Sequence, residues 1–474
     1  MTEPAVATAG HIKPSPLALV FELRRKGMLA TQLDLWRRHF DLTRVELGPA
    51  SYFLVVHPRH VRQIAVGSRH KYDKVKSYQA ARDLLFGRGM LTALGEDWRW
   101  QRQLLAPLFT PRAVEPFVGA MAAETRRYAQ RWQELSKQGP IDMVDEMKGL
   151  ASSIILNLFF AAPPDTGLVD LRRAAGDMVG YVVDRQASAL NLPLWLRTPG
   201  NLRYRRAYRV VHQYARGLIE RRRALPQADW PEDLLTALLR AHDPATGEPI
   251  NEKLLVDNCM NFFLAGYETT ALTLSFLWYA LSKHPAIEAR LHAEVDALPD
   301  PSAPSIADVR RLPYTLQVIK EVMRLYPVTP LYARDAIEDD DLDGTPVPAG
   351  SRLVLFPFAT HRHPAYWRDP ETFDPDRFTP EAEAARDPYA YHPFAAGNRI
   401  CVGNHLSILE AVVITAMLAR RFTARTAPGY EADRIIFQRV GKKSPADAKA
   451  RAVRTGRDRG YRRVTLGELL EVFR

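Results

Sequence analysis

The stretch that decides the fold of this 474-residue chain reads Phe394-Ala395-Ala396-Gly397-Asn398-Arg399-Ile400-Cys401-Val402-Gly403. It places one cysteine between two glycines and directly before an apolar helix predicted over residues 408–418. A thiolate that binds iron needs this setting, because glycines let backbone amides approach the sulfur and the ring of Phe394 can pack over it. Arg399 can meet an anionic group on the same cofactor. The alternative for Cys401 is a buried structural cysteine beside a helix start.

The cysteine content and the N-terminus indicate a protein of a reducing compartment. Only Cys259 and Cys401 are present, which gives neither a disulfide framework nor a clustered zinc pattern, and Cys259 lies in an apolar helix as inert core. Residues 1–10 lack the basic and apolar regions of a signal peptide, and no apolar run is long enough to span a membrane. We therefore expect a soluble, cytoplasmic protein, and the Ala- and Arg-rich composition indicates a bacterial source.

The formal net charge of +11 is concentrated near the C-terminus. Residues 439–463 hold ten lysines and arginines against Asp447 and Asp458, a net charge of +8. The rest of the chain is nearly balanced, so the sequence predicts no basic groove and no nucleic-acid partner. We expect this segment to be a solvated tail, with an appendage that docks a partner or an anionic surface as the alternative.

The predicted elements indicate one large, mainly α-helical domain with a small β-rich part. In chain order they are a helix over 16–40, strands over 44–47 and 52–56, helices between 98 and 326, a strand-and-turn region over 342–358, and a Pro-rich irregular stretch over 364–393 that leads into the cysteine loop. We divide the chain into a flexible N-terminus (1–15), this domain (16–430) and an atypical basic C-terminal segment (431–474).

The longest apolar helix is predicted over residues 251–283, about 50 Å at 1.5 Å per residue. It contains Ala265-Gly266-Tyr267-Glu268-Thr269-Thr270, where a glycine, an acid and two threonines replace strong helix formers, and this local conflict indicates a site. Thr269 can bond to the carbonyl of Ala265 and leave a groove for a small ligand. The alternative is an ordinary helix with a solvent-facing Glu268 and two core threonines.

Together these two segments resemble the cytochrome P450 family. The loop matches the heme-binding pattern Phe-x-x-Gly-x-Arg-x-Cys-x-Gly, and residues 265–270 match the oxygen-activation motif Ala-Gly-x-Glu-Thr-Thr. The resemblance implies the P450 fold, with the heme between the long central helix and the cysteine loop with its following helix. The site residues that it implies are Cys401 as iron ligand, Phe394, Gly397, Ala265 and Gly266 beside the heme, Thr269 to steady bound oxygen and Glu268 to relay protons.

Further matches concern the heme carboxylates. Trp98 and Arg102 lie four residues apart on one helix face and resemble the Trp-x-x-x-Arg pair that donates to heme propionates in the family. Arg334 and Arg399 match two more propionate-binding positions. Such donors suit a heme, since the two propionates are its strong anions. His392 lies near the same place and either joins them or is merely solvated.

A third match is structural. Glu321 and Arg324 are three residues apart on a predicted helix and resemble the Glu-x-x-Arg pair of the family. Arg377, in Pro375-Asp376-Arg377-Phe378, matches the later Pro-x-Arg-Phe segment. By the resemblance these three side chains would pin the irregular stretch that carries the cysteine.

The reaction that the resemblance implies is a heme b monooxygenation with O2. Because the chain shows no flavin or iron–sulfur domain, electrons from NAD(P)H would arrive through a separate ferredoxin or flavodoxin with its reductase. The Cys401 thiolate would push electron density through the iron. A lipophilic molecule such as a terpenoid, fatty acid or polyketide would be hydroxylated or epoxidised, and we expect the enzyme to be a monomer.

By the same resemblance four segments would line the substrate cavity, namely 75–91, 168–208, 262–270 and 328–332. They are apolar with some aromatic residues, which favours a medium or large lipophilic substrate. The C-terminus departs from the family pattern: an apolar hairpin is expected after Gly429, but only 434–437 could form a strand before the basic segment. A short amphipathic helix is predicted over 464–473.

Two other functional classes stay open. A heme-thiolate protein can work without external electrons, as a peroxygenase or an isomerase, although Glu268 with Thr269 favours oxygen activation. A heme-based sensor or binding module, whose basic tail contacts nucleic acid, is the other class. His361 and His363 lack a nearby third ligand and are interpreted as loop histidines, not as a metal site.

Overall fold

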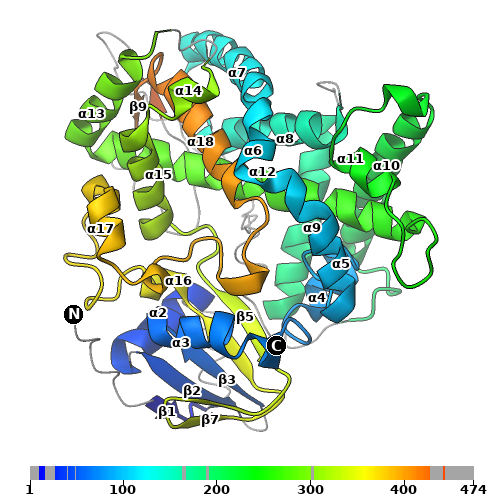
Figure 1. Cartoon of the computed structure of the whole chain (residues 1–474), viewed down its shortest axis with the longest axis vertical. Coiled ribbons are helices and arrows are strands. Elements are labelled where there is room, and N and C mark those ends of the chain that lie inside the picture. Colours follow the sequence, from blue (N-terminus) through cyan, green and yellow to red (C-terminus); the bar gives the residue numbers. More distant parts are fainter. Residues whose placement is uncertain are drawn as a thin grey trace.

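The computed structural model describes residues 10–15, 27–39, 41–47, 50–162, 167–187, 192–299, 304–426 and 441–442. It confirms a mainly α-helical chain with a small sheet, which lies at one end of the molecule (Figure 1). Of the helix predicted over 16–40, the part from Met28 to His39 is present as α2. Residues 1–9 of the expected flexible N-terminus lie outside the described residues, whereas Gly10–Ile12 forms strand β1.

Several helices, including α8 and α12, begin at capping residues that the sequence supplies. Asp142 accepts from the N–H of Val144 (3.1 Å) where α8 starts, and Asn251 accepts from the N–H of Leu254 (2.9 Å) where α12 starts. The helices are α2 (Met28–His39), α3 (Pro58–Arg62), α4 (Gln79–Ala81), α5 (Gly95–Leu105), α6 (Pro111–Val114), α7 (Val118–Gln138), α8 (Met143–Phe160), α9 (Leu168–Ala187), α10 (Pro199–Arg223), α11 (Leu234–Leu239), α12 (Glu252–Lys283), α13 (Pro285–Asp296), α14 (Ile306–Val309), α15 (Pro313–Leu325), α16 (Pro357–Thr360), α17 (Pro380–Ala384) and α18 (Asn404–Ala419).

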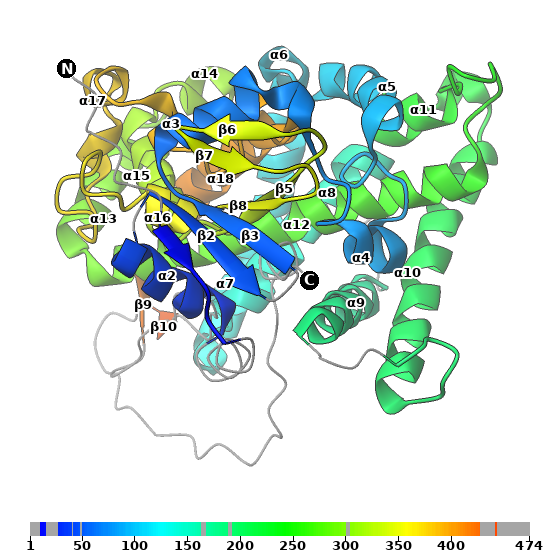
Figure 2. The ribbon, with the colours of Figure 1, turned by 90° about the horizontal axis from the view of Figure 1, so that it is seen from below.

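Six strands form one mixed sheet in the order β1-β2-β3-β8-β5-β4, seen from below in Figure 2. The strands predicted over 44–47 and 52–56 are present as β2 and β3, which pair antiparallel, and β3 pairs in parallel with β8 from 300 residues later. The strands are β1 (Gly10–Ile12), β2 (Leu42–Leu47), β3 (Ala50–Val55), β4 (Tyr72–Asp73), β5 (Tyr332–Ala336), β6 (Asp340–Leu342), β7 (Thr345–Val347), β8 (Arg352–Leu355), β9 (Ala424–Arg425) and β10 (Gly441–Lys442).

Strand β5 is a feature that the sequence did not predict. Its five residues, Tyr-Ala-Arg-Asp-Ala, are all buried and show no alternation of polar and apolar positions. A buried central strand of this kind lacks the period-two signal, and its arginine and aspartate argue against burial. The consequence for the site is that Arg334 is carried on a rigid strand.

Helix α12 crosses the middle of the molecule, and helices α8, α10, α15 and α18 pack against it (Figure 1). From Leu255 to Leu281 its residues are buried except for Ala265, Gly266 and Thr269. The three exceptions belong to the motif in which the sequence showed a conflict between composition and helix propensity. An apolar helix that is buried all round must face other elements on every side, and this one faces a cavity at these three positions.

A buried ion pair fixes the irregular stretch before the cysteine loop. Arg324 is fully buried, donates to Glu321 through Nε (2.6 Å) and Nη2 (2.8 Å), and also donates to the carbonyls of His361, Pro370 and Thr372 at 2.7–3.0 Å. The Asp374 N–H donates to Glu321 (2.8 Å), and Arg377 Nε lies 3.6 Å from the same carboxylate. Arg377 also donates through Nη2 to the Asp369 carbonyl (3.0 Å), so the structure brings the three predicted side chains together on the 361–377 backbone.

The C-terminal segment mostly lies outside the described residues, which include only Gly441 and Lys442 beyond residue 426. These two residues form β10, antiparallel to β9. The strand predicted over 434–437, most of the basic segment and the helix predicted over 464–473 therefore lie outside the described part of the chain.

Replacing Arg324 by alanine should strongly destabilise the protein. Glu321 would stay buried without its ion-pair partner, which costs about 3–5 kcal/mol. Thermal unfolding of the purified variant should show a large fall in Tm relative to the wild type. Arg173→Ala is the matched control, because Arg173 pairs with Asp170 at the same spacing but on the surface, where such a pair contributes about 0.3–0.5 kcal/mol. Equal losses in the two variants would contradict the structural role of Arg324.

Candidate active site

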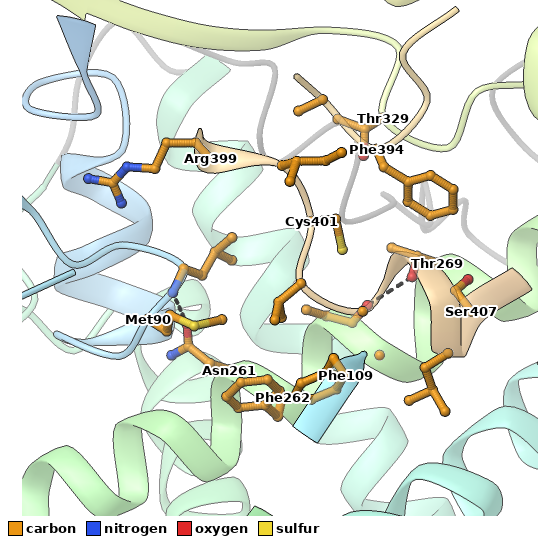
Figure 3. A pocket seen from close by; sticks show the side chains of 18 of the residues that line it. Met90, Phe109, Asn261, Phe262, Thr269, Thr329, Phe394, Arg399, Cys401 and Ser407 are labelled. Carbon is orange, nitrogen blue, oxygen red and sulfur yellow. Dashed lines mark hydrogen bonds between the residues drawn. The ribbon is translucent and has the colours of Figure 1, made fainter. Parts of the chain in front are cut away.

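A cavity of about 240 Å³ lies between α12, the cysteine loop, the start of α18 and the segment from Lys74 to Leu91. Figure 3 shows Cys401, Thr269 and Phe262 around it. The predicted site residues that line it are Trp98, Arg102, Ala265, Gly266, Thr269, Arg334, Phe394, Arg399 and Cys401. Gly397 and Glu268 are not among its lining residues. The site predicted from two distant motifs is therefore assembled by the fold, with two members set back from the cavity.

The loop that carries Cys401 folds back on itself. The Cys401 N–H donates to the Phe394 carbonyl (3.0 Å), and this closes the loop so that the sulfur faces the cavity (Figure 3). Gly397 has φ of +72°, and a Cβ at this position would lie 2.0 Å from the carbonyl oxygen of Ala65. This glycine is required because the loop crosses the backbone of residues 63–67 at close range. The backbone N–H that hydrogen-bonds to the Cys401 sulfur belongs to Gly403 and not to Gly397.

The Cys401 thiol is exposed to the cavity but withdrawn from bulk solvent. Burial raises the pKa of this thiol, and the Gly403 amide, Arg102 and Lys74 oppose the rise. Without a cation the thiol therefore resists ionisation, whereas a coordinated metal ion would keep it as a thiolate. The surroundings suit a sulfur that becomes charged only when metal is bound.

On the opposite wall, Thr269 makes the bond that the sequence predicted. Its hydroxyl donates to the Ala265 carbonyl at 2.8 Å, and the Thr273 hydroxyl donates to the Thr269 carbonyl at 3.1 Å. Helix α12 nevertheless continues without interruption through this point. Ala265, Gly266 and Thr269 are the partly exposed positions of this stretch and line the cavity, and a Cβ at Gly266 would lie 3.1 Å from Ile155 Cδ1.

Glu268 does not line the cavity and forms an ion pair with helix α8. Its carboxylate accepts from Lys148 of α8 at 2.7 Å, with the Glu268 side chain 5 % exposed and that of Lys148 21 % exposed. The solvent-facing orientation that was the alternative at the sequence level is wrong, because Glu268 is buried in an ion pair. The pair connects the interior of α12 with a lysine that reaches solvent.

Four cationic side chains gather at the cavity. Arg102, Arg334 and Arg399 were predicted from the sequence, and Lys74 was not. Arg399 ion-pairs with Asp73 and lies 4.0 Å above the Trp98 ring. Of the described residues, no carboxylate pairs with the other three; Arg102 donates to the Ile400 carbonyl, Arg334 to that of Ala333 and Lys74 to that of Leu91.

This excess of positive charge is costly in the absence of an anion. Burial, and secondly Arg334 and Arg399, hold the pKa of Lys74 well below its usual value. Burial likewise lowers the pKa of Arg399 to about 10, against the opposing effect of Asp73. A dianion such as the two propionates of a heme would pair with these groups, so the residues present fit the expected cofactor.

Glu410 is a buried acid that the sequence analysis missed. It lies on α18, is 1 % exposed, lines the cavity and leaves its Oε1 without a hydrogen-bond partner among the described residues. Burial raises its pKa to about 8, although Thr270 acts in the opposite direction. Thr270 also meets Ser407 of α18, with 3.1 Å between the two hydroxyl oxygens. A longer motif that included α18 would have been needed to find this contact.

One prediction about the cavity wall farther from Cys401 is wrong. Residues 75–91, 262–270 and 328–332 contribute to the lining as expected, but none of the described residues between 168 and 208 does. Ile155 and Phe159 of α8 and Phe109 take their place, because α8 packs along α12 at this level. All three lie more than a hundred residues before the Ala265–Thr270 motif in the chain, so that motif gave no indication of them.

The three histidines near the loop are buried, not solvated. His361 Nε2 accepts from the His392 N–H at 2.9 Å, and His363 lies 2.7 Å from Asp41. Burial lowers the pKa of His392 to about 3, and its Nε2 has no hydrogen-bond partner among the described residues. The described part of the chain contains no cluster of ligands able to hold a metal ion. His361 and His363, which the sequence predicted as loop histidines, are thus each held by a polar contact in the interior.

Comparison with known proteins places this geometry in one family. A family model described as cytochrome P450 matches residues 14–447. The chain is 34 % identical to cyclooctat-9-en-7-ol 5-monooxygenase of Streptomyces melanosporofaciens, over 85 % of this chain and 88 % of that protein. It is 33 % identical to pentalenene oxygenase of Streptomyces avermitilis, over 82 % of this chain and 85 % of that protein.

Solved structures show the same fold. The heme domain of cytochrome P450DA superposes with a TM-score of 0.79 at 24 % identity, covering 93 % of this chain and 97 % of that one. A cytochrome P450 named CYP102L1 gives a TM-score of 0.80, also at 24 % identity, over 92 % and 98 % of the two chains. No helix in the described part of the chain is long and apolar enough to cross a bilayer.

Glu410→Gln should remove a pH-dependent loss of stability. In the folded protein the pKa of Glu410 is about 8, whereas the ordinary value is 4.5, so the folded chain holds a proton that the unfolded chain has released between these values. Stability contributed by this proton is full below pH 4.5 and is lost as the pH rises towards 8. Unfolding of heme-loaded wild type and variant should therefore give similar Tm values near pH 5 and a higher Tm for Glu410→Gln at pH 8. A constant difference across this range would show that Glu410 does not titrate there.

Proposed function

The chain belongs to the cytochrome P450 family, and from this premise we propose how its own residues hold the heme, deliver protons and select the substrate. It is a heme-thiolate monooxygenase that inserts one oxygen atom from O2 into a lipophilic organic substrate, with electrons from a redox partner. The observation that carries the residue assignments is the cavity that joins Cys401, Thr269 and the cationic cluster.

We assign Cys401 as the iron ligand. A heme bound here supplies oxygen activation, and its thiolate ligand donates electron density to the iron. The Gly403 amide and Phe394 would steady the sulfur. Lys74, Arg102, Arg334 and Arg399, with the indole of Trp98, would hold the two propionates, since these side chains face the cavity with too few carboxylates to pair with.

Proton delivery is assigned to Glu268 and Thr269. The Lys148 ammonium, which reaches solvent, holds a proton against the Glu268 carboxylate at 2.7 Å. Thr269 follows Glu268 directly and borders the cavity. Its hydroxyl proton is donated to the Ala265 carbonyl. The lone pairs of the hydroxyl oxygen are therefore free to accept a hydrogen bond from a donor on the cavity side.

The substrate proposed is a cyclic terpene hydrocarbon or its mono-alcohol. Phe109, Phe159 and Phe262 meet with ring centroids 5.4–5.9 Å apart and form an apolar wall. The polar groups on this side are already bonded within the protein: Asn261 uses both its oxygen and its nitrogen, and Thr269 donates to Ala265. Such a wall recognises shape more than functional groups. The names of the two Streptomyces relatives indicate substrates of this class.

The remaining assignments concern the partner and the setting. We propose a ferredoxin or flavodoxin with an NAD(P)H-dependent reductase as the electron source, a monomeric enzyme, and a cytoplasmic location. Reconstitution with a ferredoxin and its reductase, with NADPH consumption and product followed together, tests the electron source. Size-exclusion chromatography with light scattering tests the monomer.

Cys401→His should abolish the spectrum of a thiolate-bound heme. The reduced wild-type protein with carbon monoxide should show the red-shifted Soret band that thiolate ligation produces. The variant keeps the propionate-binding side chains, so heme should remain bound while the band moves to the position typical of a histidine ligand. Cys259→Ala is the control, since Cys259 is buried away from the cavity and should leave the band unchanged. A red-shifted band in Cys401→His would refute the ligand assignment.

Cyclic terpene hydrocarbons should convert the ferric heme to high spin more effectively than fatty acids of equal carbon number. A carboxylate placed against the phenylalanine wall would be buried without a partner, and we expect at least about tenfold weaker binding for this reason. Titration with pentalenene and with pentadecanoic acid, followed by the Soret shift, gives both dissociation constants. Tighter binding of the acid would overturn the proposed substrate class without affecting the iron assignment.

A further inference from the structure

Three side chains on one stretch of α12 hold the backbone of the loop that forms part of the cavity wall. Asp257 Oδ2 accepts from the Arg88 N–H at 2.9 Å. Asn258 Oδ1 accepts from the Met90 N–H at 3.1 Å, and Asn261 Oδ1 accepts from the Leu91 N–H at 3.1 Å. One helix therefore satisfies three of the amides of an irregular segment that has no sheet or helix to satisfy them.

The carbonyl groups of the same loop are held as well. Asn261 Nδ2 donates to the Phe86 carbonyl at 2.7 Å. Asn258 Nδ2 donates to Gln101 Oε1 at 3.0 Å, and Gln101 Nε2 donates in turn to the Arg88 carbonyl at 3.2 Å. Asp257, Asn258, Asn261 and Gln101 are each at most 4 % exposed. The bonds are thus formed away from water, where an unpaired polar group is costly.

Glycines allow the loop to come this close to α12. Gly87 has φ of +57°, and a Cβ there would lie 2.1 Å from the Asp257 carboxyl group. A Cβ at Gly89 would lie 2.3 Å from the amide nitrogen of Asn261. Any larger residue at either position would push the loop away from the helix.

The loop presents Met90 and Leu91 to the cavity, beside Asn261 and Phe262 of α12 (Figure 3). Lys74, one of the proposed propionate-binding groups, donates to the Leu91 carbonyl at 3.2 Å. Just before the loop, the Tyr204 hydroxyl of α10 donates to the Leu84 carbonyl at 2.6 Å. The position of this wall relative to Thr269, two turns along the same helix, therefore depends on the contacts from Asp257, Asn258 and Asn261.

We propose that Asp257, Asn258 and Asn261 form a latch that holds the 86–91 loop on α12 and thereby sets both the cavity wall at Met90 and Leu91 and the rate at which ligands leave the cavity. The inference rests on the proposed function in that the cavity is taken as the substrate site. Asp257, Asn258 and Asn261 are positioning residues. Asp257 and Asn258 do not line the cavity, and Asn261, which does, has its amide fully engaged by the loop and the helix.

Asn258→Leu is the variant that tests the latch. Leucine has a similar size but cannot accept from Met90 or donate to Gln101, and no atom that lines the cavity is changed. Hydrogen–deuterium exchange of the heme-loaded protein should become at least about tenfold faster in peptides covering 86–91, with little change in α8 and α18. Asn258→Asp, which keeps the acceptor for Met90, should show a smaller effect.

Ligand dissociation gives a readout that a merely structural residue would not change. 4-Phenylimidazole binds heme iron whatever the natural substrate is, and its release can be followed by the Soret shift after rapid displacement with carbon monoxide in the reduced protein. We expect release from Asn258→Leu to be at least about tenfold faster, with the thiolate-type carbon monoxide band unchanged.

Cys259→Ala is the matched control, because Cys259 is the next residue on the same helix, is equally buried and makes no bond to the loop. Three exchange results would overturn the latch. The first is unchanged hydrogen exchange at 86–91 in Asn258→Leu, and the second is an equal acceleration of this exchange in Cys259→Ala. The third is faster exchange spread over all of α12 and α8. The exchange result does not depend on iron ligation, whereas failure of the proposed function would show as loss of the carbon monoxide band in the wild type.

Discussion

Buried positive charge without matching carboxylates is the constraint on which the site depends. Lys74, Arg102, Arg334 and Arg399 face one cavity, and Asp73 is the carboxylate among the described residues that pairs with one of them. Taking such charges out of water is unfavourable unless partners are supplied. The protein therefore needs an anionic ligand at this point, so heme binding should contribute to the stability of the surrounding fold and not only to its activity.

The contrast with Arg324 shows how a structural cation differs from one kept for a ligand. Every direction of the Arg324 guanidinium is occupied, by Glu321 on one side and by three carbonyls on the other. Arg102 and Arg334 each have one carbonyl partner and an open face to the cavity. The number of unmet donors, rather than burial, separates the two classes, since Arg334 is buried as Arg324 is.

The sequence predicted the parts of the site that are encoded locally. The cysteine loop and the Ala265–Thr270 motif could be found because each contains residues that ordinary helices or turns avoid. Lys74, Glu410 and Phe159 could not, because their roles come from packing against elements far away in the chain. The 168–208 segment was expected at the cavity and α8 stands there instead, which depends on how α8 packs along α12. Strand β5 escaped prediction because a fully buried strand has no alternating pattern.

Helix α12 contacts several of the segments that surround the cavity. Its first half bonds to the loop that carries Met90 and Leu91, its middle borders the cavity at Ala265 and Thr269, and Thr270 meets Ser407 on the helix that follows Cys401. Because a helix is stiff along its axis, a displacement of α12 would move the proposed substrate wall, the proposed proton-delivering residues and the contact with α18 together. The polar residues of this otherwise apolar and buried helix thus each hold or face a neighbouring segment of the proposed site.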